Sequence, residues 1–227
     1  GQLVMLASSD PAVRLVAPFG GVTAQMTPNP LAVGIPTGGD PILIDISTSI
    51  TTFGLALRLR DAGKSFPGQW ALDARGNPSD DPNVVTGEPK GSLLPAGGVD
   101  HGHKGYALAL VIEALTQALS GYGRADAPSG WGASVWVQVF DASHFAGRAQ
   151  FERQMGWLAQ TCRNTAPRPG FDAVRVPGEQ ALARKRHALA EGVALFPTIV
   201  PALTKWAGEF GVRPPQPKAR SLVRSTP

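Results

Sequence analysis

The stretch that decides the fold reads Leu93-Leu-Pro-Ala-Gly-Gly-Val-Asp-His-Gly-His-Lys-Gly-Tyr-Ala-Leu-Ala-Leu110. Its pattern predicts a glycine-rich loop that leads through His103 and Lys104 into a helix. Free amide N–H groups, the positive end of a helix dipole and a lysine favour an anion at such a position. The pattern fits an ordinary glycine-rich helix start equally well, and it matches neither a P-loop nor a G-x-G-x-x-G motif.

A second candidate anion site is the segment Asp45-Ile-Ser-Thr-Ser49, which follows an apolar strand and precedes a predicted helix. The hydroxyls of Ser47, Thr48 and Ser49 could hold a phosphate. Taken alone, however, the segment is explained better by simple N-capping. Asp45 ends the strand, so we expect it to be partly buried and to serve as an acid, a base or a ligand-orienting group.

Outward from these two segments, the apolar pattern predicts strands mixed with long helices, which is a mixed α/β (α+β) class. We expect one stripe of the helix after Lys104 to be buried, formed by Leu108, Ile112, Leu115 and Leu119. The predicted strands are 3–7, 31–35, 42–46, 133–141 and 173–176. The predicted helices are 47–62, 106–119, 146–162 and 180–210, the last being one or two helices bent by Pro197 and Pro201.

The same reading divides the chain into a main domain, 1–179, a helical segment, 180–212, and a tail, 213–227. Within the main domain, residues 64–102 form a long connection rich in Pro, Gly, Asp and Asn, which we expect to carry function. The tail has four basic residues and no acidic ones, and the whole chain has a formal net charge of +4. The body is therefore formally neutral, which favours a disordered basic tail over a nucleic-acid surface.

Composition excludes several classes of protein. No apolar run reaches the roughly 20 residues of a membrane span. Cys162 is the only cysteine, which excludes an internal disulfide and fits a reducing, cytoplasmic compartment. The four histidines lack metal-ligand spacing, so no metal site is predicted. The first seven residues are typical of an interior strand, so we expect this chain to be a fragment.

Several motifs, taken in order, resemble those of the malate/L-lactate dehydrogenase family, which is unrelated to the Rossmann-fold lactate dehydrogenases. That family includes ureidoglycolate and sulfolactate dehydrogenases and Δ1-piperideine-2-carboxylate reductase. The matching motifs are Pro18-Phe-Gly-Gly21, Asn29-Pro-Leu-Ala-Val-Gly-Ile-Pro36, Asp45-Ile-Ser-Thr-Ser49, Gly76-Asn-Pro-Ser-Asp-Asp-Pro82, Leu93-Leu-Pro-Ala-Gly-Gly98, His103-Lys-Gly-Tyr-Ala-Leu108, Leu119-Ser-Gly121 and Val176-Pro-Gly-Glu179.

The resemblance implies an oxidoreductase that uses NAD or NADP and acts on a small 2-oxo acid, 2-hydroxy acid or cyclic imino acid. It also implies a homodimer and the family's own cofactor-binding fold, with a largely antiparallel sheet flanked by helices in place of a Rossmann fold. Asp45 is the matching candidate for the catalytic acid or base. The residues that match cofactor-binding positions are Asn29, Pro30, Asp45, Ser47, Thr48, Ser49, His103, Lys104, Gly105, Pro177, Gly178 and Glu179.

Two features depart from the family pattern. Thr27-Pro28-Asn29-Pro30 stands where the family usually has Gly-Thr-Asn-Pro, so one hydroxyl contact is lost or displaced. None of the four histidines matches the family's Asp-Ser-His-Gly or Ser-Asn-His motif, although carbonyl or imine reduction needs a proton donor. We therefore expect the principal histidine in a missing N-terminal segment, which a second chain could supply. The alternative is a non-catalytic nucleotide-binding or interaction module derived from the family.

Overall fold

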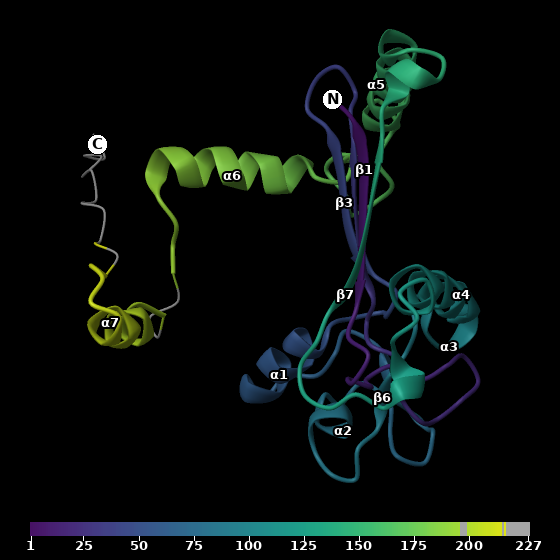
Figure 1. Cartoon of the computed structure of the whole chain (residues 1–227), viewed down its shortest axis with the longest axis vertical. Helices are drawn as coiled ribbons and strands as arrows, with labels where there is room; N and C mark the ends of the chain where they lie inside the picture. The colour runs from purple at the N-terminus through teal and green to yellow at the C-terminus, as the bar shows by residue number, and fades with distance from the viewer. Residues whose placement is uncertain (196–198, 215, 217–227) are drawn as a thin grey trace. The chain divides into compact units, whose positions relative to one another are not determined.

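The chain divides into two units by its internal contacts, Gly1–Gly178 and Glu179–Pro227. The computed structural model describes residues 1–195, 199–214 and 216 of these. Figure 1 shows the elements of both units along the chain. Among the described residues, no helix is long and apolar enough to cross a membrane.

A long four-stranded antiparallel sheet runs through the first unit (Figure 1). In its strand register, Met5 lies opposite Val33 of one neighbouring strand and opposite Gln138 of the other. Four of the predicted strands and the largely antiparallel sheet are confirmed. In spatial order the strands are β3 (Ile42–Ser47), β2 (Pro30–Ile35), β1 (Leu3–Ser9) and β7 (Ser134–Phe140).

The two faces of this sheet have different surroundings, because successive side chains of a strand point to opposite faces. On one face, Ile42 packs with Ala159 of helix α5 (Arg148–Arg163) and with Val176. On the other face, apolar side chains of β1 and β7 are between 36% and 56% exposed. We call this second surface the valine face; it consists of Val4, Leu6, Val135, Val137 and Val139.

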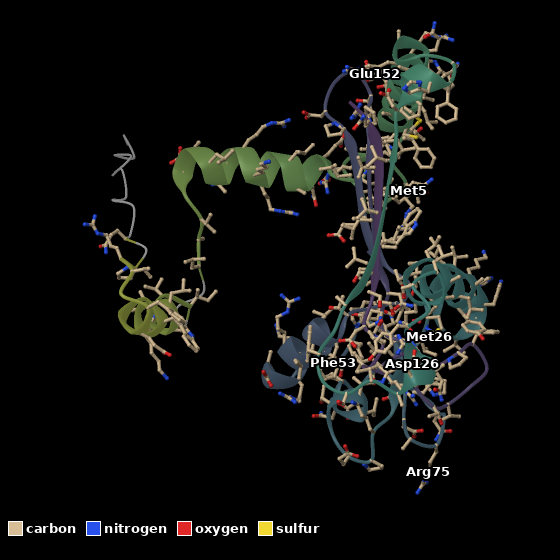
Figure 2. All side chains as sticks on the ribbon, in the orientation of Figure 1. Met5, Met26, Phe53, Arg75, Asp126 and Glu152 are labelled. Carbon is tan, nitrogen blue, oxygen red and sulfur yellow. The ribbon has the colours of Figure 1, made fainter. Side chains whose placement is uncertain are left out.

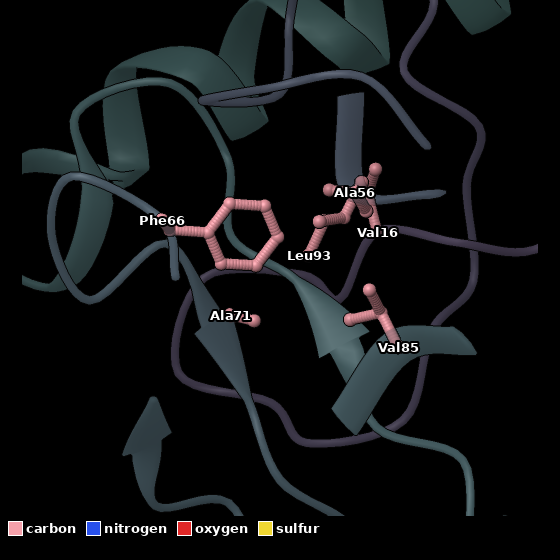
Figure 3. Packing of buried hydrophobic residues seen from close by; sticks show 6 residues of the cluster. All are labelled: Val16, Ala56, Phe66, Ala71, Val85 and Leu93. Atoms are coloured by element: carbon pink, nitrogen blue, oxygen red, sulfur yellow. The ribbon is translucent and has the colours of Figure 1, made fainter. Parts of the chain in front are cut away.

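The residues at one end of the sheet form a lobe with its own apolar core (Figure 3). This core takes Phe66, Ala71, Val85 and Leu93 from residues 64–102, so the prediction of one long connection there is wrong. Three small strands and two short helices order the segment, and four of its side chains belong to the hydrophobic cluster. These elements are β4 (Ala71–Leu72), β5 (Pro78–Ser79), α2 (Asn83–Thr86), β6 (Ser92–Leu93) and α3 (Gly98–His101).

Helix α1 (Phe53–Asp61) begins later than predicted, because Thr52 accepts the capping hydrogen bond from the amide of Leu55. The helix ends as predicted at Gly63, whose φ of +61° suits glycine. Ala56 is its fully buried side chain and joins the core of the lobe. The segment Ser47–Ser49 therefore does not cap a helix.

Helix α4 (His103–Glu113) continues into a π-helical turn, Ala114–Ala118, which together cover the predicted helix. The predicted buried stripe is only partly right: Ile112 is buried, but Leu119 is 73% exposed. Apart from Ile112, the buried side is instead formed by small and polar residues. The small ones let the helix approach the neighbouring backbone closely. The members of the buried side are Gly105, Ala109, Ile112, Thr116 and Gln117.

Two short 3-10 helices complete the first unit, Arg124–Asp126 and Ala142–His144. The strand predicted at 173–176 is not formed; Val176 is buried within an irregular segment. The second unit contains two helices, α6 (Glu179–Glu191) and α7 (Ile199–Glu209). Pro201 lies in the first turn of α7, where proline is tolerated, so it does not bend the helix. Pro197 and most of the tail 213–227 lie outside the described residues.

Candidate functional site

Hydrogen bonds join three segments that are far apart in the sequence but belong to the motifs quoted above. The Pro28 carbonyl accepts from the backbone N–H of Thr48 at 2.8 Å and from its hydroxyl at 3.0 Å. The Thr48 carbonyl in turn accepts from the amide of Ala96 at 2.7 Å, and the Ala96 carbonyl accepts from Gly105 at 3.1 Å. The two candidate anion sites predicted from the sequence are therefore neighbours.

Gly105 allows this contact because it has no side chain. A Cβ atom there would lie 2.4 Å from the Ala96 nitrogen and 2.6 Å from the Thr48 carbonyl oxygen. Real Cβ atoms essentially never come so close to backbone atoms. The helix that carries His103 and Lys104 can therefore lie against the Ser47–Ser49 segment only with glycine at this position.

The start of helix α4 differs from the predicted open loop. The short helix α3 precedes it directly, and Gly102 between them has right-handed helical angles and donates its N–H to the Gly98 carbonyl. His103 and Lys104 are exposed. The His103 ring lies edge-on to Phe19, with 5.6 Å between ring centroids, so the Pro18-Phe-Gly-Gly21 motif also reaches this place.

Ser47, Thr48 and Ser49 have different surroundings although they are consecutive. The Ser47 hydroxyl is half-buried, lies 3.2 Å from the Ser49 hydroxyl and donates to the Ser49 carbonyl at 3.1 Å. Ser49 is buried and donates to the Thr51 carbonyl. Thr48 is 1% exposed and serves the backbone network described above. Ser47 is thus the hydroxyl of the three that is most open to a ligand.

Asp45 is exposed, so the prediction that it is partly buried is wrong. The reason is its position on the outermost strand β3, opposite Ala32 of β2, on the face of the sheet that also carries Leu6 and Val137. Leu6 and Val137, which share this face, are also exposed, at 41% and 56%. The carboxyl of Asp45 is therefore accessible to a ligand from the open side of the sheet.

Asn29 and Pro30 lie behind the site. Asn29 is 0% exposed, and its side-chain amide donates to a carboxylate oxygen of Glu113 at 2.8 Å. Its carbonyl oxygen accepts from the hydroxyl of Thr27. Pro30 begins β2 and lies opposite Ser47 in the sheet. The amide of Asn29 is committed to protein partners, which favours a supporting role.

Pro177 and Gly178 lie against β3. The Pro177 carbonyl accepts from the amide of Leu43 at 3.0 Å, and a Cβ on Gly178 would lie 2.7 Å from the Cβ of Leu43. Gly178 also has φ of +97°, which glycine adopts readily. Glu179 is the first residue of α6 in the second unit. The start of a helix favours a negative charge, so the observed position of Glu179 agrees with its expected place in the first turn.

The sequence analysis did not identify a buried polar cluster next to the site, which we call the Glu113 cluster. It consists of Ser9, Thr27, Asn29, Glu113, Gln117 and Arg124. The sequence held one signal, a charged residue on an otherwise apolar helix, but its partners are too distant in the sequence to be paired by pattern.

Other candidate groups have local structural roles. Asp73 accepts hydrogen bonds from the side chain and amide of Asn77 and from the amide of Arg75, which lowers the pKa of its carboxyl and fixes a turn. Among the described residues, no three His, Cys, Asp or Glu side chains gather as a metal site. An apolar hollow of about 730 Å³ lies beside α5, lined partly by Leu3, Phe140 and Met155. Figure 2 shows Glu152 of α5 at the opposite end of the sheet from Met26 and Asp126.

Comparisons with known proteins identify the family of this chain. Residues 2–204 match the model of the malate/L-lactate dehydrogenase family. The chain is 34% identical to L-lactate dehydrogenase of Cupriavidus necator over 88% of this chain and 58% of that protein. It is 29% identical to malate dehydrogenase of Pyrococcus horikoshii over 87% of this chain and 57% of that protein. The chain thus spans less than two thirds of the length of these relatives.

Solved structures of similar proteins share the fold. Malate dehydrogenase from Entamoeba histolytica aligns with a TM-score of 0.82 at 25% identity, over 94% of this chain and 63% of that one. Δ1-Piperideine-2-carboxylate reductase from Pseudomonas syringae aligns with a TM-score of 0.71 at 25% identity, over 89% of this chain and 60% of that one. The predicted fold class is confirmed by these likenesses and by the antiparallel sheet.

Proposed function

Because this chain belongs to the malate/L-lactate dehydrogenase family, we propose that it is the cofactor-binding part of an NAD(P)-dependent oxidoreductase. The substrate would be a small 2-hydroxy acid, 2-oxo acid or cyclic imino acid. The observation that carries the proposal is the hydrogen-bonded chain Pro28–Thr48–Ala96–Gly105, which joins the motifs expected to hold the cofactor. The motifs are far apart in the sequence, and these hydrogen bonds bring them together in the fold.

The residues at this place fit a dinucleotide phosphate. Lys104 is exposed and forms no ion pair with another described residue. Ser47 offers a half-buried hydroxyl on the segment that packs against the helix of Lys104. A cation and a hydroxyl on adjoining backbones can together bind an anion. Ser47, Lys104 and His103 are therefore the side chains we assign to direct cofactor contact.

The buried members of the expected set have a supporting role in this proposal. Asn29, Thr48 and Ser49 make hydrogen bonds to the protein, and Pro30, Gly105 and Gly178 shape the backbone. The side chains assigned to cofactor contact do not select between NAD and NADP. Relatives are named for both forms, ureidoglycolate dehydrogenase of Escherichia coli for NAD(+) and sulfolactate dehydrogenase of Chromohalobacter salexigens for NADP(+).

A bound nicotinamide supplies or accepts the hydride. The remaining task for the protein is to move one proton and to orient the substrate. Asp45 is exposed on the strand that leads to Ser47, so its carboxylate can accept or return a proton or orient a polar substrate group. We assign Asp45 this role, and we assign the histidine expected in this family to a further polypeptide segment.

The valine face supports a partner. Contiguous apolar side chains on one face of a sheet commonly mark a contact with another surface. We propose that this contact is a homodimer, and that a separate polypeptide with the family's histidine motifs is the alternative occupant. The single free cysteine, Cys162, fits action in the cytoplasm, which we propose on the same basis.

Fluorescence titration with NADH and with NADPH tests the cofactor site. We expect Lys104→Ala and Ser47→Ala each to weaken binding, the lysine change by on the order of tenfold because it removes a charge-assisted contact. Lys64→Ala is the matched control, since Lys64 is an exposed lysine outside the site. Unchanged affinity in both site variants would contradict the proposal.

Hydride transfer is then measured with pyruvate and a cyclic imino acid as substrates, with and without added N-terminal polypeptide. Turnover that needs the added polypeptide would support shared catalysis. Turnover by this chain alone would show that it holds a sufficient proton donor. Cofactor binding without turnover under either condition would favour the non-catalytic module.

A further inference from the structure

The Glu113 cluster makes a closed set of buried hydrogen bonds. Ser9 and Asn29 are 1% and 0% exposed, and the side chains of Glu113 and Arg124 are 16% and 18% exposed. One carboxylate oxygen of Glu113 accepts from Ser9 at 3.0 Å, from Asn29 at 2.8 Å and from Arg124 at 2.7 Å. The other accepts from Nε of Arg124 at 3.0 Å. Within the described residues, no buried side-chain nitrogen or oxygen lacks a partner.

Asn29 has a backbone conformation that needs this support. Its φ is +47°, a left-handed value that side-chain-bearing residues adopt uncommonly, and Pro30 follows it. A residue before proline normally adopts an extended conformation. Both ends of the Asn29 amide are held, one by Thr27 and the other by Glu113. The cluster therefore fixes an unfavourable backbone conformation at residue 29.

The conformation of residue 29 is transmitted directly to the cofactor motifs. Residue 28 provides the carbonyl that accepts both hydrogen bonds of Thr48. Thr48 holds Ala96, and Ala96 holds Gly105 at the start of the helix that carries Lys104. A change at Asn29 thus reaches Ser47 and Lys104 through consecutive hydrogen bonds.

The helix is also irregular at this place. The π-helical turn Ala114–Ala118 begins directly after Glu113, and it brings Gln117 inward to donate to Ser9 at 2.8 Å. The Gln117 carbonyl oxygen accepts from the amide of Arg124 at 3.0 Å. Single π-turns often occur at functional sites. A buried ion pair is also a poor means of stabilising a fold compared with apolar packing, so a role in specifying geometry is the better explanation.

We propose that Glu113 is a positioning residue for nucleotide binding, which acts by holding Asn29 in its left-handed conformation and thereby sets Thr48, Ser47 and Lys104. The inference rests on the proposed function for the site itself. It adds Glu113 and its partners Arg124, Thr27 and Ser9 to the residues that determine cofactor affinity. None of these side chains touches the cofactor in this account.

The test replaces the donor of one hydrogen bond, the Asn29 amide, with an acceptor. Asn29→Asp places a carboxylate against Glu113, and two adjacent carboxylates cannot both remain charged without a cost. The charged side chains of the cluster are Glu113 and Arg124. Relative to the wild type at the same pH, we expect NADPH or NADH affinity to fall by on the order of tenfold at about pH 8 and to recover towards pH 6, where the pair can share a proton.

A second substitution should restore the hydrogen bond without acid. In the double variant Asn29→Asp/Glu113→Gln, the carboxylate and the amide exchange places, so one again donates to the other. Because Arg124 loses its carboxylate partner in this variant, we expect its affinity at about pH 8 to rise above that of Asn29→Asp and to stay below that of the wild type. Asn164→Asp is the control, because it makes the same change at an exposed position at the end of α5. Circular dichroism ensures that each titration is made on fully folded protein.

The amide resonance of Thr48 provides a readout that needs no cofactor, since its hydrogen bond to the Pro28 carbonyl should weaken in Asn29→Asp and return in the double variant. Wild-type protein that bound neither nucleotide would overturn the proposed function and this inference together. Wild-type binding with unchanged affinity and an unchanged Thr48 resonance in Asn29→Asp would overturn this inference alone. A loss of affinity that neither low pH nor Glu113→Gln reversed would also overturn it.

Discussion

The Glu113 cluster and the valine face depart from the usual distribution of side chains in opposite directions. In the cluster, buried polar side chains hydrogen-bond to the partly buried Glu113 and Arg124, and no buried side-chain polar atom among the described residues lacks a partner. On the valine face, the apolar side chains of Val137 and its neighbours are between 36% and 56% exposed. Burying a polar group without a hydrogen-bond partner costs free energy, whereas covering exposed apolar side chains is favourable. The cluster is satisfied by partners within the described residues, whereas the valine face is the surface that we propose contacts another polypeptide.

Gly105→Ala should have the largest effect on the side of this comparison that holds the Glu113 cluster. Its Cβ would lie 2.4 Å and 2.6 Å from backbone atoms of Ala96 and Thr48, so the helix must move away. We expect a loss of about 3 kcal/mol in the free energy of unfolding, at the upper end for overpacked interiors, together with loss of nucleotide binding. Urea denaturation and fluorescence titration measure the two effects.

Gly54→Ala is the matched control. Gly54 also lies in a helix, but a Cβ there would meet nothing within 4 Å. Alanine is the better helix former, so the free energy of unfolding of the control should rise by up to about 1 kcal/mol. Similar stability changes in the two variants would show that the contact of Gly105 with Thr48 is not tight.

Arg124→Met tests whether the cluster behaves as a buried pair. The substitution leaves Glu113 without its cation, and we expect a loss of about 2–4 kcal/mol in the free energy of unfolding. The double variant Arg124→Met/Glu113→Leu should recover most of that loss, because no charge remains buried. Arg60→Met, which breaks an exposed pair with Asp61, should cost less than about 1 kcal/mol. Equal losses at Arg124 and Arg60 would contradict the buried character of the cluster.

Val137→Thr/Val139→Thr tests the open side of the comparison. Threonine keeps the branched shape that suits a strand but adds a hydroxyl, so folding should change little while self-association weakens. We expect a dimer dissociation constant raised by about tenfold, measured by sedimentation. Val212→Thr in the second unit is the control. Unaltered association in the double variant would exclude the valine face as the dimer contact.

The smallest effect concerns the exposed pair of Arg148 and Glu152 on α5, which lies in neither region. Arg148 donates to Glu152 at 2.7 Å and lowers the pKa of its carboxyl below the usual 4.5. Because the folded pKa is the lower one, the pair stabilises the fold above that pH and loses its effect as the pH falls through the folded value. Arg148→Gln should raise the pKa of Glu152 in an NMR titration, with nucleotide affinity unchanged. An unmoved titration would exclude the pair.

The sequence predicted elements better than it predicted their surroundings. The strands of the long sheet and the helices were found because their apolar patterns are local. The surroundings of Asp45 and Leu119 depend on which face of an element is covered, and periodicity does not report this. The start of α1 was placed too early because several hydroxyls precede it, and the structure selects Thr52 as the cap.

The site was predicted in part for the same reason. The two candidate anion segments were identified separately, but their contact through Ala96 depends on tertiary structure. The Glu113 cluster joins residues as far apart as Ser9 and Arg124, so no local spacing could have indicated it. The hydroxyl of Thr27, in the segment that departs from the family pattern, donates to the Asn29 side chain.

Hydrogen–deuterium exchange with and without saturating NADPH or NADH tests the central claim most directly. Bound nucleotide should protect residues 47–52 and 97–106, on either side of the Thr48–Ala96–Gly105 hydrogen bonds. Little change is expected around the apolar hollow beside Phe140 and Met155. Protection confined to that hollow, or no change anywhere at saturating nucleotide, would contradict the assignment of the cofactor site.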